Sequence, residues 1–243
     1  MAESTSLPIP RTTSPLYGAQ AGELAGQLAT LSTEELAKIL RVNHRIAATN
    51  RLRYSRFHDD AERALPALAA YTGIVFKRIA PADFTAGDFE YAQAHLNITS
   101  FLYGLLRPLD AIRTYRLEGD AVLPGHGEQT GFEDWQDKLT DAFLEKIKAD
   151  DGILVNLASS EMKRLFDWKR ICREVRVVTP EFRIREDDRL KTVVVYTKMC
   201  RGEMTRYILK NRIGDPQQLK AFEWEGFRQD AALSKADDWV FTM

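Results

Sequence analysis

The chain has 243 residues, of which 44% are hydrophobic and 28% charged, an ordinary composition for a globular protein. This composition excludes collagen-like, low-complexity and disordered proteins, and no stretch approaches the about eighteen uncharged apolar residues of a transmembrane helix. Lys and Arg number 34 against 35 Asp and Glu, which gives a net charge of −1. Taken alone, that sum argues against a nucleic-acid-binding protein, because such proteins usually carry a basic excess.

The N-terminal residues and the cysteines bear on compartment and redox chemistry. Residues 1–15 are polar and rich in Pro, Ser and Thr, without the apolar core of a signal sequence, so we expect a cytoplasmic protein with a flexible tail over residues 1–20. Cys172 and Cys200 form no CxxC pair, which predicts neither a disulfide framework nor a zinc site. A redox-active thiol at Cys200 stays open, since Arg201 follows it and a cation lowers the pKa of a thiol; the alternative is a buried structural thiol.

Helical periodicity dominates the first half of the chain. Ser32 and Glu35 have the spacing of a capping box, and Asn43 predicts a break that divides residues 22–50 into shorter helices. Further helices are expected over residues 59–70, over 132–148, and from the Thr85–Asp88 cap towards residue 106. Residues 71–79 are expected to be strand or irregular, and residues 121–131 a loop.

Strands dominate the second half. They are expected over residues 152–157, 175–178 and 191–196, followed by a helix over residues 202–212. The alternation of strands and helices predicts a mixed α/β (α+β) fold, with a single domain over residues 21–243 in which helices cover a mixed sheet.

The charges are segregated along the chain. Residues 36–58 carry a net charge of +6, residues 163–176 carry +4 and residues 189–212 carry +6, so the remainder carries −17. Lys38, Arg41 and Arg45 are spaced to share one helical face. Such an array suits a phosphate backbone, because each neutralised phosphate releases counterions. The alternative is a solvated basic face that pairs with acidic segments of the fold.

Common catalytic motifs are absent from the sequence. It contains no phosphate-binding loop, nucleophile elbow or zinc-protease motif, and its four histidines show no metal-ligand spacing, so no metal or cofactor is expected. The densest polar and aromatic cluster runs over residues 102–118. There Arg107 and Arg116 can grip phosphate or carboxylate, while Asp110 and Glu118 either hold these arginines or act as an acid/base pair. An internal salt-bridge network is the alternative.

Several motifs in this chain resemble those of the peroxide-stress protein YaaA family. They are Leu102-Tyr-Gly-Leu-Leu-Arg-Pro-Leu-Asp110 running into Tyr115-Arg-Leu-Glu118, Asn156-Leu-Ala-Ser-Ser-Glu161, Arg201-Gly-Glu-Met-Thr-Arg-Tyr-Ile-Leu-Lys-Asn-Arg212 and Ala47-Ala-Thr-Asn-Arg51. The resemblance covers residues 25–243. The family usually begins with an apolar strand ending in Ser-Pro-Ala-Lys-Thr, whereas this chain has Thr13-Ser-Pro-Leu16, so that strand and one cleft lysine are missing or diverged.

The resemblance implies a cytosolic bacterial protein that protects against hydrogen peroxide by limiting free iron. It also implies binding to the phosphate backbone of duplex or distorted DNA through a basic cleft and a helix-hairpin-helix-like element, here residues 31–51. The nucleic-acid contacts carried over are Lys38, Arg41, Arg45, Arg51, Arg107, Arg116, Lys198, Arg201, Arg206 and Lys210. The polar residues expected in the cleft are Tyr103, Tyr115, Asn156, Ser159 and Asn211. A monomer is favoured over an oligomer, and a binding protein over an enzyme.

Two other hypotheses stay open. The first is a nucleobase- or nucleotide-processing enzyme that uses Asp110, Glu118 or Glu161 as acid and base. The second is direct iron binding by the carboxylate pairs Asp59–Asp60 or Asp187–Asp188, although their spacing matches no known ligand pattern.

Overall fold

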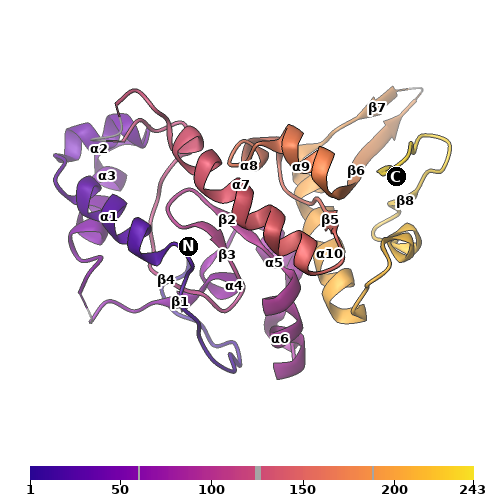
Figure 1. Ribbon diagram of the computed structural model, residues 1–243, viewed down its shortest axis with the longest axis horizontal. Coiled ribbons are helices and arrows are strands. Elements are labelled where there is room, and N and C mark those ends of the chain that lie inside the picture. Colours follow the sequence, from indigo (N-terminus) through magenta and orange to yellow (C-terminus); the bar gives the residue numbers. More distant parts are fainter. Residues whose placement is uncertain (60, 124–126, 188) are drawn as a thin grey trace.

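The structure is a computed structural model that describes residues 1–59, 61–123, 127–187 and 189–243 (Figure 1). Its helices are α1 (Gly18–Ala29), α2 (Thr33–Ile39), α3 (His44–Ser55), α4 (Ala67–Ala70), α5 (Ile74–Ile79), α6 (Ala86–His95), α7 (Gly131–Ala149), α8 (Ser160–Lys163), α9 (Trp168–Glu174) and α10 (Val194–Asn211), with 3-10 helices η1 (Pro81–Asp83) and η2 (Pro216–Ala221). Its strands are β1 (Leu65–Pro66), β2 (Ile98–Ser100), β3 (Gly104–Leu106), β4 (Ala111–Ile112), β5 (Ile153–Val155), β6 (Arg176–Glu186), β7 (Arg189–Lys191), β8 (Arg228–Gln229) and β9 (Asp238–Thr242). The expected mixed α/β class is confirmed.

The N-terminal helices follow the sequence signals closely. The Ser32 side chain accepts a hydrogen bond from the Glu35 amide, and the Glu35 carboxylate accepts one from the Ser32 amide, as a capping box requires. Asn43 separates α2 from α3 and caps α3 by accepting a hydrogen bond from the Ile46 amide at 3.0 Å. The turn between the two helices contains Arg41 at φ +50°, a left-handed conformation that non-glycine residues seldom adopt.

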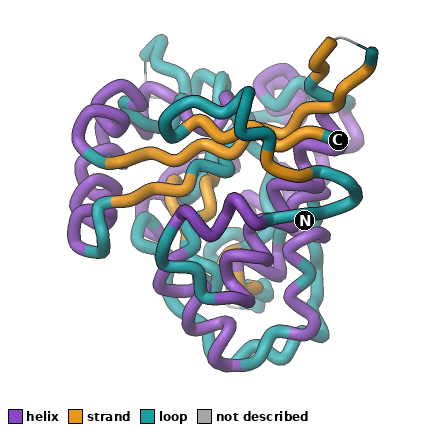
Figure 2. Tube along the Cα trace, turned by 90° about the vertical axis from the view of Figure 1, so that its right-hand side faces the viewer, coloured by secondary structure: helices purple, strands orange, loops and turns teal. Residues whose placement is uncertain are grey.

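The main sheet contains parallel and antiparallel pairs in the order β5-β6-β9-β8, with β7 also paired to β6. β6 is parallel to both β5 and β9, whereas β8 and β9 are antiparallel. Figure 2 shows these strands side by side at one end of the molecule. α10 contributes Cys200 and Met204 to the apolar layer on this sheet, which also contains Phe182, Phe241 and Trp239. The sheet end therefore has its own apolar layer beneath α10.

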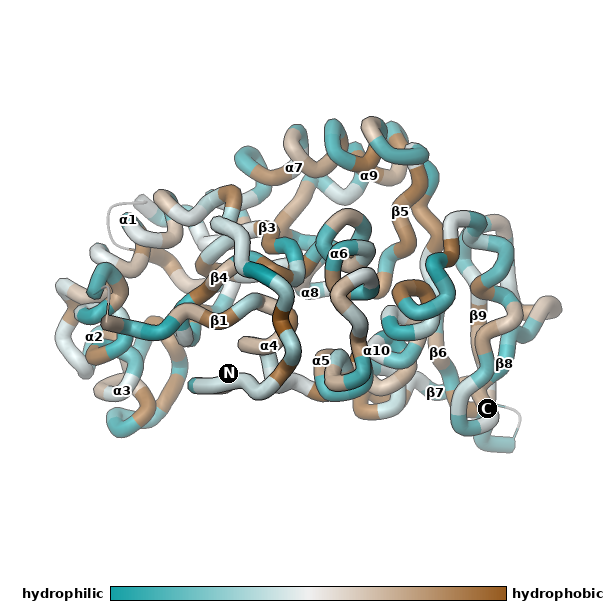
Figure 3. The backbone as a smooth tube through the Cα atoms, turned by 90° about the horizontal axis from the view of Figure 1, so that it is seen from below, coloured by the Kyte–Doolittle hydropathy of each residue, from teal (hydrophilic) through white to brown (hydrophobic). Residues whose placement is uncertain are grey.

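A second and larger apolar cluster joins the N-terminal helices to α7. Trp135 and Leu139 on α7 are fully buried in it, together with Leu36 of α2 and Tyr54 of α3. Figure 3 shows α7 and α9 along one edge of the molecule, and α3, α5 and α10 towards the other. No helix in the described ranges is long and apolar enough to cross a bilayer.

The structure differs from the sequence-based prediction at three central segments. The helix expected up to residue 106 ends at His95, and the antiparallel pair β2–β3 follows it. Gly104 has φ +66° in the turn of this pair, and an added Cβ there would lie 2.7 Å from the Trp135 ring, so both the turn geometry and the packing require glycine. Residues 71–79 were expected to be strand or irregular but contain the helix α5. Residues 59–70, expected to be helical, contain β1 and the short α4.

A fourth difference lies at the start of α10. Residues 191–196 were expected to be a strand because they are rich in β-branched side chains, yet α10 begins at Val194. Tertiary packing of α10 on α5 and on the sheet outweighs this local preference, which is a weak one.

The segment predicted as a flexible tail is packed on the body. α1 already begins at Gly18, inside that segment. The Ala2 amide donates a hydrogen bond to the Ala70 carbonyl at 2.8 Å, and Thr13 forms a parallel bridge with Asp110. Contacts distant in sequence thus fix residues whose composition alone resembles that of a loose tail.

Candidate nucleic-acid interface and adjoining pocket

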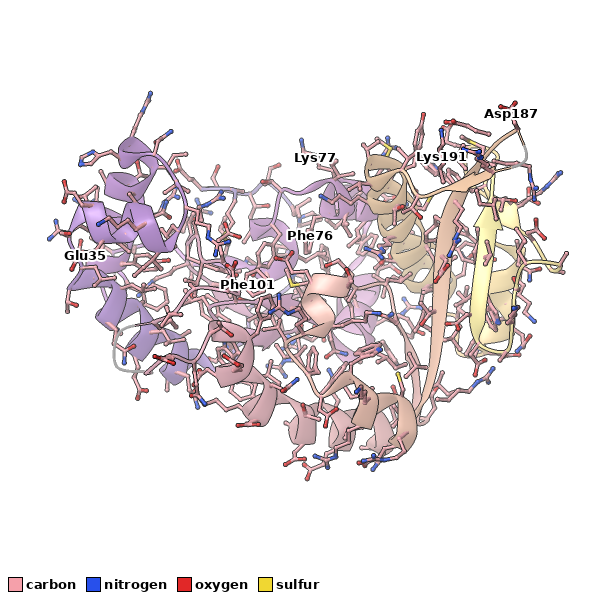
Figure 4. All side chains as sticks on the ribbon, turned by 90° about the horizontal axis from the view of Figure 1, so that it is seen from above. Glu35, Phe76, Lys77, Phe101, Asp187 and Lys191 are labelled. Carbon is pink, nitrogen blue, oxygen red and sulfur yellow. The ribbon has the colours of Figure 1, made fainter. Side chains whose placement is uncertain are left out.

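A pocket of about 400 Å³ lies between α3 and the segment around Tyr115. We call it the tyrosine pocket; the residues that define it here are Asn50, Arg53, Tyr71, Ser100, Tyr115, Arg116 and Glu118, together with Phe101. In Figure 4, Phe101 and Phe76 lie near the middle of the molecule, between the N-terminal helices and α10. Phe76 stacks on Tyr71 with ring centroids 4.9 Å apart, which fixes the Tyr71 ring beside the pocket.

Three hydroxyl groups form a chain along one wall of this pocket. The Tyr71 and Tyr115 hydroxyls are 2.8 Å apart, and the Tyr115 hydroxyl is 2.7 Å from Ser100 Oγ. Ser100 Oγ also accepts a hydrogen bond from the Tyr103 amide at 2.9 Å. Burial raises the pKa of both Tyr71 and Tyr115, so both phenols keep their protons at neutral pH.

α3 forms another part of the lining. The Tyr54 hydroxyl donates a hydrogen bond to the Arg116 carbonyl, which joins α3 to the segment around Tyr115. Asn50 is 2% exposed, and its Nδ2 donates to the Ile46 carbonyl at 2.8 Å. Its Oδ1 is buried and has no hydrogen-bond partner among the described residues. The sequence analysis did not select Asn50 as a site residue, although it lies in the Ala47–Arg51 motif.

Half of the predicted nucleic-acid contacts are engaged in ion pairs. These pairs are Arg41–Asp120 at 2.5 Å, Arg107–Asp110 at 2.9 Å, Arg116–Glu118 at 2.8 Å, Arg206–Asp83 at 2.5 Å and Lys210–Asp88 at 3.1 Å. Arg51 donates to the Leu31 carbonyl. The structure therefore gives these arginines and Lys210 intramolecular partners, as the salt-bridge alternative anticipated.

The other predicted cations form no ion pair with a described residue. Within the described ranges, Lys38, Arg45 and Lys198 are exposed and form no ion pair. Arg201 is different, because its Nε atom is buried without a hydrogen-bond partner among the described residues. Burial lowers the pKa of Arg201, as expected for a cation withdrawn from water without a neighbouring carboxylate. These four positions thus remain able to receive an external anion.

Exposed cations lie along one edge of the molecule. Figure 4 shows Lys77 of α5 and Lys191 of β7 pointing outward along the same edge, which α3 reaches at its other end. Lys77 forms no ion pair with any described residue, whereas Lys191 is paired with Glu186. Arg45 of α3, Lys77 of α5 and Lys198 of α10 are exposed and form no ion pair with a described residue, and we call these three cations the basic edge. The sequence analysis missed Lys77 because it treated residues 71–79 as an apolar strand.

The predicted cleft residues are dispersed by the fold. Tyr115 lines the tyrosine pocket, whereas Tyr103 is buried and its hydroxyl accepts a hydrogen bond from the Arg113 amide. Asn156 follows β5 and accepts from the Ala158 amide, and Ser159 caps α8. Asn211 donates to the Tyr207 carbonyl within α10. These last three side chains have local structural roles and do not line the pocket.

The carboxylates proposed as acid and base do not form a group. Asp110 is 1% exposed and accepts hydrogen bonds from Thr13 Oγ1 at 2.6 Å and from the Arg107 amide at 2.7 Å. Glu118 lines the pocket but is paired with Arg116, and Glu161 is exposed on α8. The pairs Asp59–Asp60 and Asp187–Asp188 were the candidates for iron binding, and the second residues of the two pairs, Asp60 and Asp188, lie outside the described residues. The described residues contain no cluster of three or more His, Cys, Asp or Glu suited to a metal ion.

Neither cysteine has the environment of an activated thiolate. Cys200 is fully buried, and burial raises the pKa of its thiol to about 12, so the following Arg201 does not activate it. Cys172 is exposed, yet partial burial also raises its pKa. The structure thus favours the alternative of a buried structural thiol at Cys200.

Asp88 ties α6 to α10 and gives a pH-dependent prediction. Its carboxylate accepts a hydrogen bond from the Thr85 amide and pairs with Lys210 and Arg212, both at 3.1 Å. The Thr85 amide first, and Lys210 next, lower the pKa of Asp88 to about 2. The charged form is therefore favoured in the folded state, so its stabilisation is complete above about pH 4 and is lost as the pH falls towards 2.

We expect Asp88→Asn to lower the free energy of unfolding by about 1–2 kcal/mol at pH 7, since it removes a charge that receives three charge-assisted hydrogen bonds. Urea denaturation between pH 7 and pH 2.5 measures the effect. The difference between wild type and variant should shrink below about pH 4. A difference that stays constant over this range would show that the Asp88 charge does not stabilise the fold.

The fold and the site define a mixed α/β protein in which a basic edge borders a tyrosine-lined pocket. A sequence model of the peroxide stress protein YaaA matches residues 1–233. Over 241 residues the chain is 58% identical to a UPF0246 protein of Bacteroides thetaiotaomicron, covering 99% of this chain and 94% of the relative. It is also 46% identical to a UPF0246 protein of Porphyromonas gingivalis, covering 96% and 91% of the two chains.

A more distant UPF0246 protein, from Clostridium beijerinckii, is 33% identical over 95% of this chain and 89% of its own length. The chain belongs to the peroxide stress protein YaaA family.

Proposed function

We propose that this protein binds DNA through backbone phosphates that lie along the basic edge. The observation that carries the proposal is the division of the cations into two groups. Arg107, Arg206 and Lys210 are neutralised by acidic partners. The cations of the basic edge have no such partner among the described residues, although they come from three separate elements. Unpaired cations on one edge are suited to a polyanion, because their pairing releases counterions from the nucleic acid.

The α2–α3 unit supports this proposal. α3 begins with the Asn43 cap, which occupies the Ile46 amide and leaves the first amides of the helix without a side-chain acceptor. No acidic residue lies in the first turn of α3, where Arg45 adds a positive charge. A helix start of this kind favours phosphate. We therefore propose the two helices and their turn as the helix-hairpin-helix-like element that the resemblance implies for residues 31–51.

In the peroxide-stress context, we propose that the protein acts on cytoplasmic DNA exposed to oxidation. The limitation of free iron, implied by the same resemblance, would serve the same end by reducing iron-driven damage. Of these two roles, DNA binding is the one that the unpaired cations of the basic edge support. The nucleobase-processing alternative loses Asp110 as a free acid or base, because Thr13 and Arg107 engage its carboxylate.

The test is fluorescence anisotropy with a labelled DNA duplex at two salt concentrations. Arg45→Glu combined with Lys77→Glu should weaken binding about 10-fold or more at low salt and reduce the dependence of affinity on salt, because two phosphate contacts are lost. Arg173→Glu is the matched control. This residue is an exposed cation of α9, without an ion pair among the described residues, and Figure 3 places α9 on the opposite edge.

The control variant should bind as the wild type does. Equal affinity of the double variant and the control would refute the basic edge as the binding surface. An affinity of the wild type that does not change with salt would refute phosphate binding altogether.

A further inference from the structure

We propose that the tyrosine pocket holds one nucleobase extruded from the DNA strand that the basic edge binds. The inference rests on the proposed function, and it adds the kind of DNA that the protein prefers. The pocket's volume of about 400 Å³ lies near the lower end of the about 300–1,000 Å³ typical of small-molecule sites. A single base is a ligand small enough for a site of this volume.

Asn50 lines the pocket and has a hydrogen-bond acceptor without a partner among the described residues. The Ile46 carbonyl can only accept, so the Asn50 amide must turn its Nδ2 towards it, and this fixes the orientation of the side chain. Oδ1 is then left buried without a donor among the described residues. Such an atom costs free energy unless a ligand N–H reaches it. An amino or imino group of a base is a donor of the required kind.

The hydroxyl chain of the lining contains a donor without an acceptor among the described residues. Tyr71, Tyr115 and Ser100 carry three hydroxyl protons, and the two contacts between them use two. The amide of Tyr103 already donates to Ser100 Oγ, so it consumes none of these protons. One hydroxyl proton therefore has no acceptor among the described residues and is available to a ligand. The pocket thus offers one acceptor and one donor, and the pairing edge of a base carries both complementary groups.

The charges and rings of the pocket favour a neutral, flat ligand. Arg116 is paired with Glu118 at 2.8 Å and Arg53 with Glu3 at 3.4 Å, so neither guanidinium is left without a carboxylate. A phosphate would have to compete with these carboxylates, while a neutral base need not. Phe101 and the rings of Tyr71 and Tyr115 provide aromatic surface, on which every base can stack. The phosphates of the same strand would lie outside, on the basic edge.

The experiment compares two duplexes that differ by one base. One contains a single extrahelical adenine, and the other contains an abasic residue at the same position. The wild type should bind the adenine duplex about 10-fold more tightly, since stacking and hydrogen bonds to one base are lost in the other. Asn50→Ala should remove this preference, provided that its circular dichroism and melting curve match those of the wild type.

The outcomes separate the two proposals. Equal wild-type affinity for the adenine and abasic duplexes, with salt-dependent binding to both, would overturn the base pocket and leave the basic edge standing. If the wild type bound neither duplex at low salt, both the base pocket and the basic edge would be overturned. Calorimetric titration with adenosine distinguishes a free nucleoside from an extruded base, because tight adenosine binding without a preference for the adenine duplex would overturn extrusion. The wild-type comparison needs no variant, so misfolding of Asn50→Ala leaves the test intact.

Discussion

Replacing Gly202 by alanine is expected to lower the free energy of unfolding by about 3 kcal/mol, because α10 has no room for a side chain there. An added Cβ would lie 2.3 Å from the Val75 carbonyl oxygen and 2.5 Å from Arg78 Cβ, both on α5. A backbone oxygen cannot move aside as a flexible side chain does, so α5 and α10 would have to separate. Lys77 and Lys198 of the basic edge lie on these two helices, so we also expect weaker DNA binding.

Urea denaturation at neutral pH measures this effect, and Gly26→Ala provides the matched control. Gly26 lies within α1, and an added Cβ at this position meets no atom within 4 Å. Alanine is the better helix former, so the control should be neutral or more stable by up to about 1 kcal/mol. If both substitutions stabilised the protein alike, the close packing of α5 on α10 would be wrong.

Trp135→Ala is expected to destabilise the protein by about 4 kcal/mol, the loss typical of a fully buried aromatic side chain. Trp135 is 2% exposed and packs on Gly104, and its indole N–H donates a hydrogen bond to the Phe101 carbonyl at 2.8 Å. The substitution would leave a cavity and also an unpaired carbonyl beneath the β2–β3 turn. Since Ser100 and Phe101 line the tyrosine pocket, the preference for an extrahelical base should fall as well.

Thermal and urea unfolding measure the loss in the free energy of unfolding. Trp135→Phe separates the contribution of packing from that of the hydrogen bond. Phenylalanine fills most of the volume but donates no hydrogen bond, so it should cost about half as much as alanine. A cost below about 1 kcal/mol for Trp135→Ala would show that α7 does not support the pocket through this residue.

The net charge of −1 is a poor guide to the charges on the surface. Three basic segments are offset by acidic residues elsewhere, and the fold pairs some of these opposite charges and leaves others unpaired. Arg206 and Asp83 are distant in sequence yet form a pair at 2.5 Å. Lys77 lies in none of the three basic segments and yet belongs to the basic edge. Net charge and local charge density are properties of the sequence, whereas unpaired charge is a property of the structure.

The sequence alone determined the features that depend on near neighbours. Ser32 with Glu35, Asn43, and Thr85 with Asp88 all cap helices where their spacing predicted. The amphipathic pattern of residues 132–148 became α7, and the apolar run after Gly152 became β5. Caps and periodic patterns act within a few residues, so a single sequence contains the information that they need. The family motifs likewise identified the family, because they are read directly from the sequence.

Tertiary structure alone decided the end of the predicted helix at His95, the helical state of residues 74–79 and the composition of the pocket. Each depends on contacts between residues distant in sequence, as Gly202 against Val75 and Trp135 against Gly104 illustrate. Asn50 became a candidate ligand-binding residue only because the fold buries its Oδ1 without a donor among the described residues. Burial and pairing arise from the whole chain, and the free energy that they contribute exceeds the weak local preferences that a sequence displays.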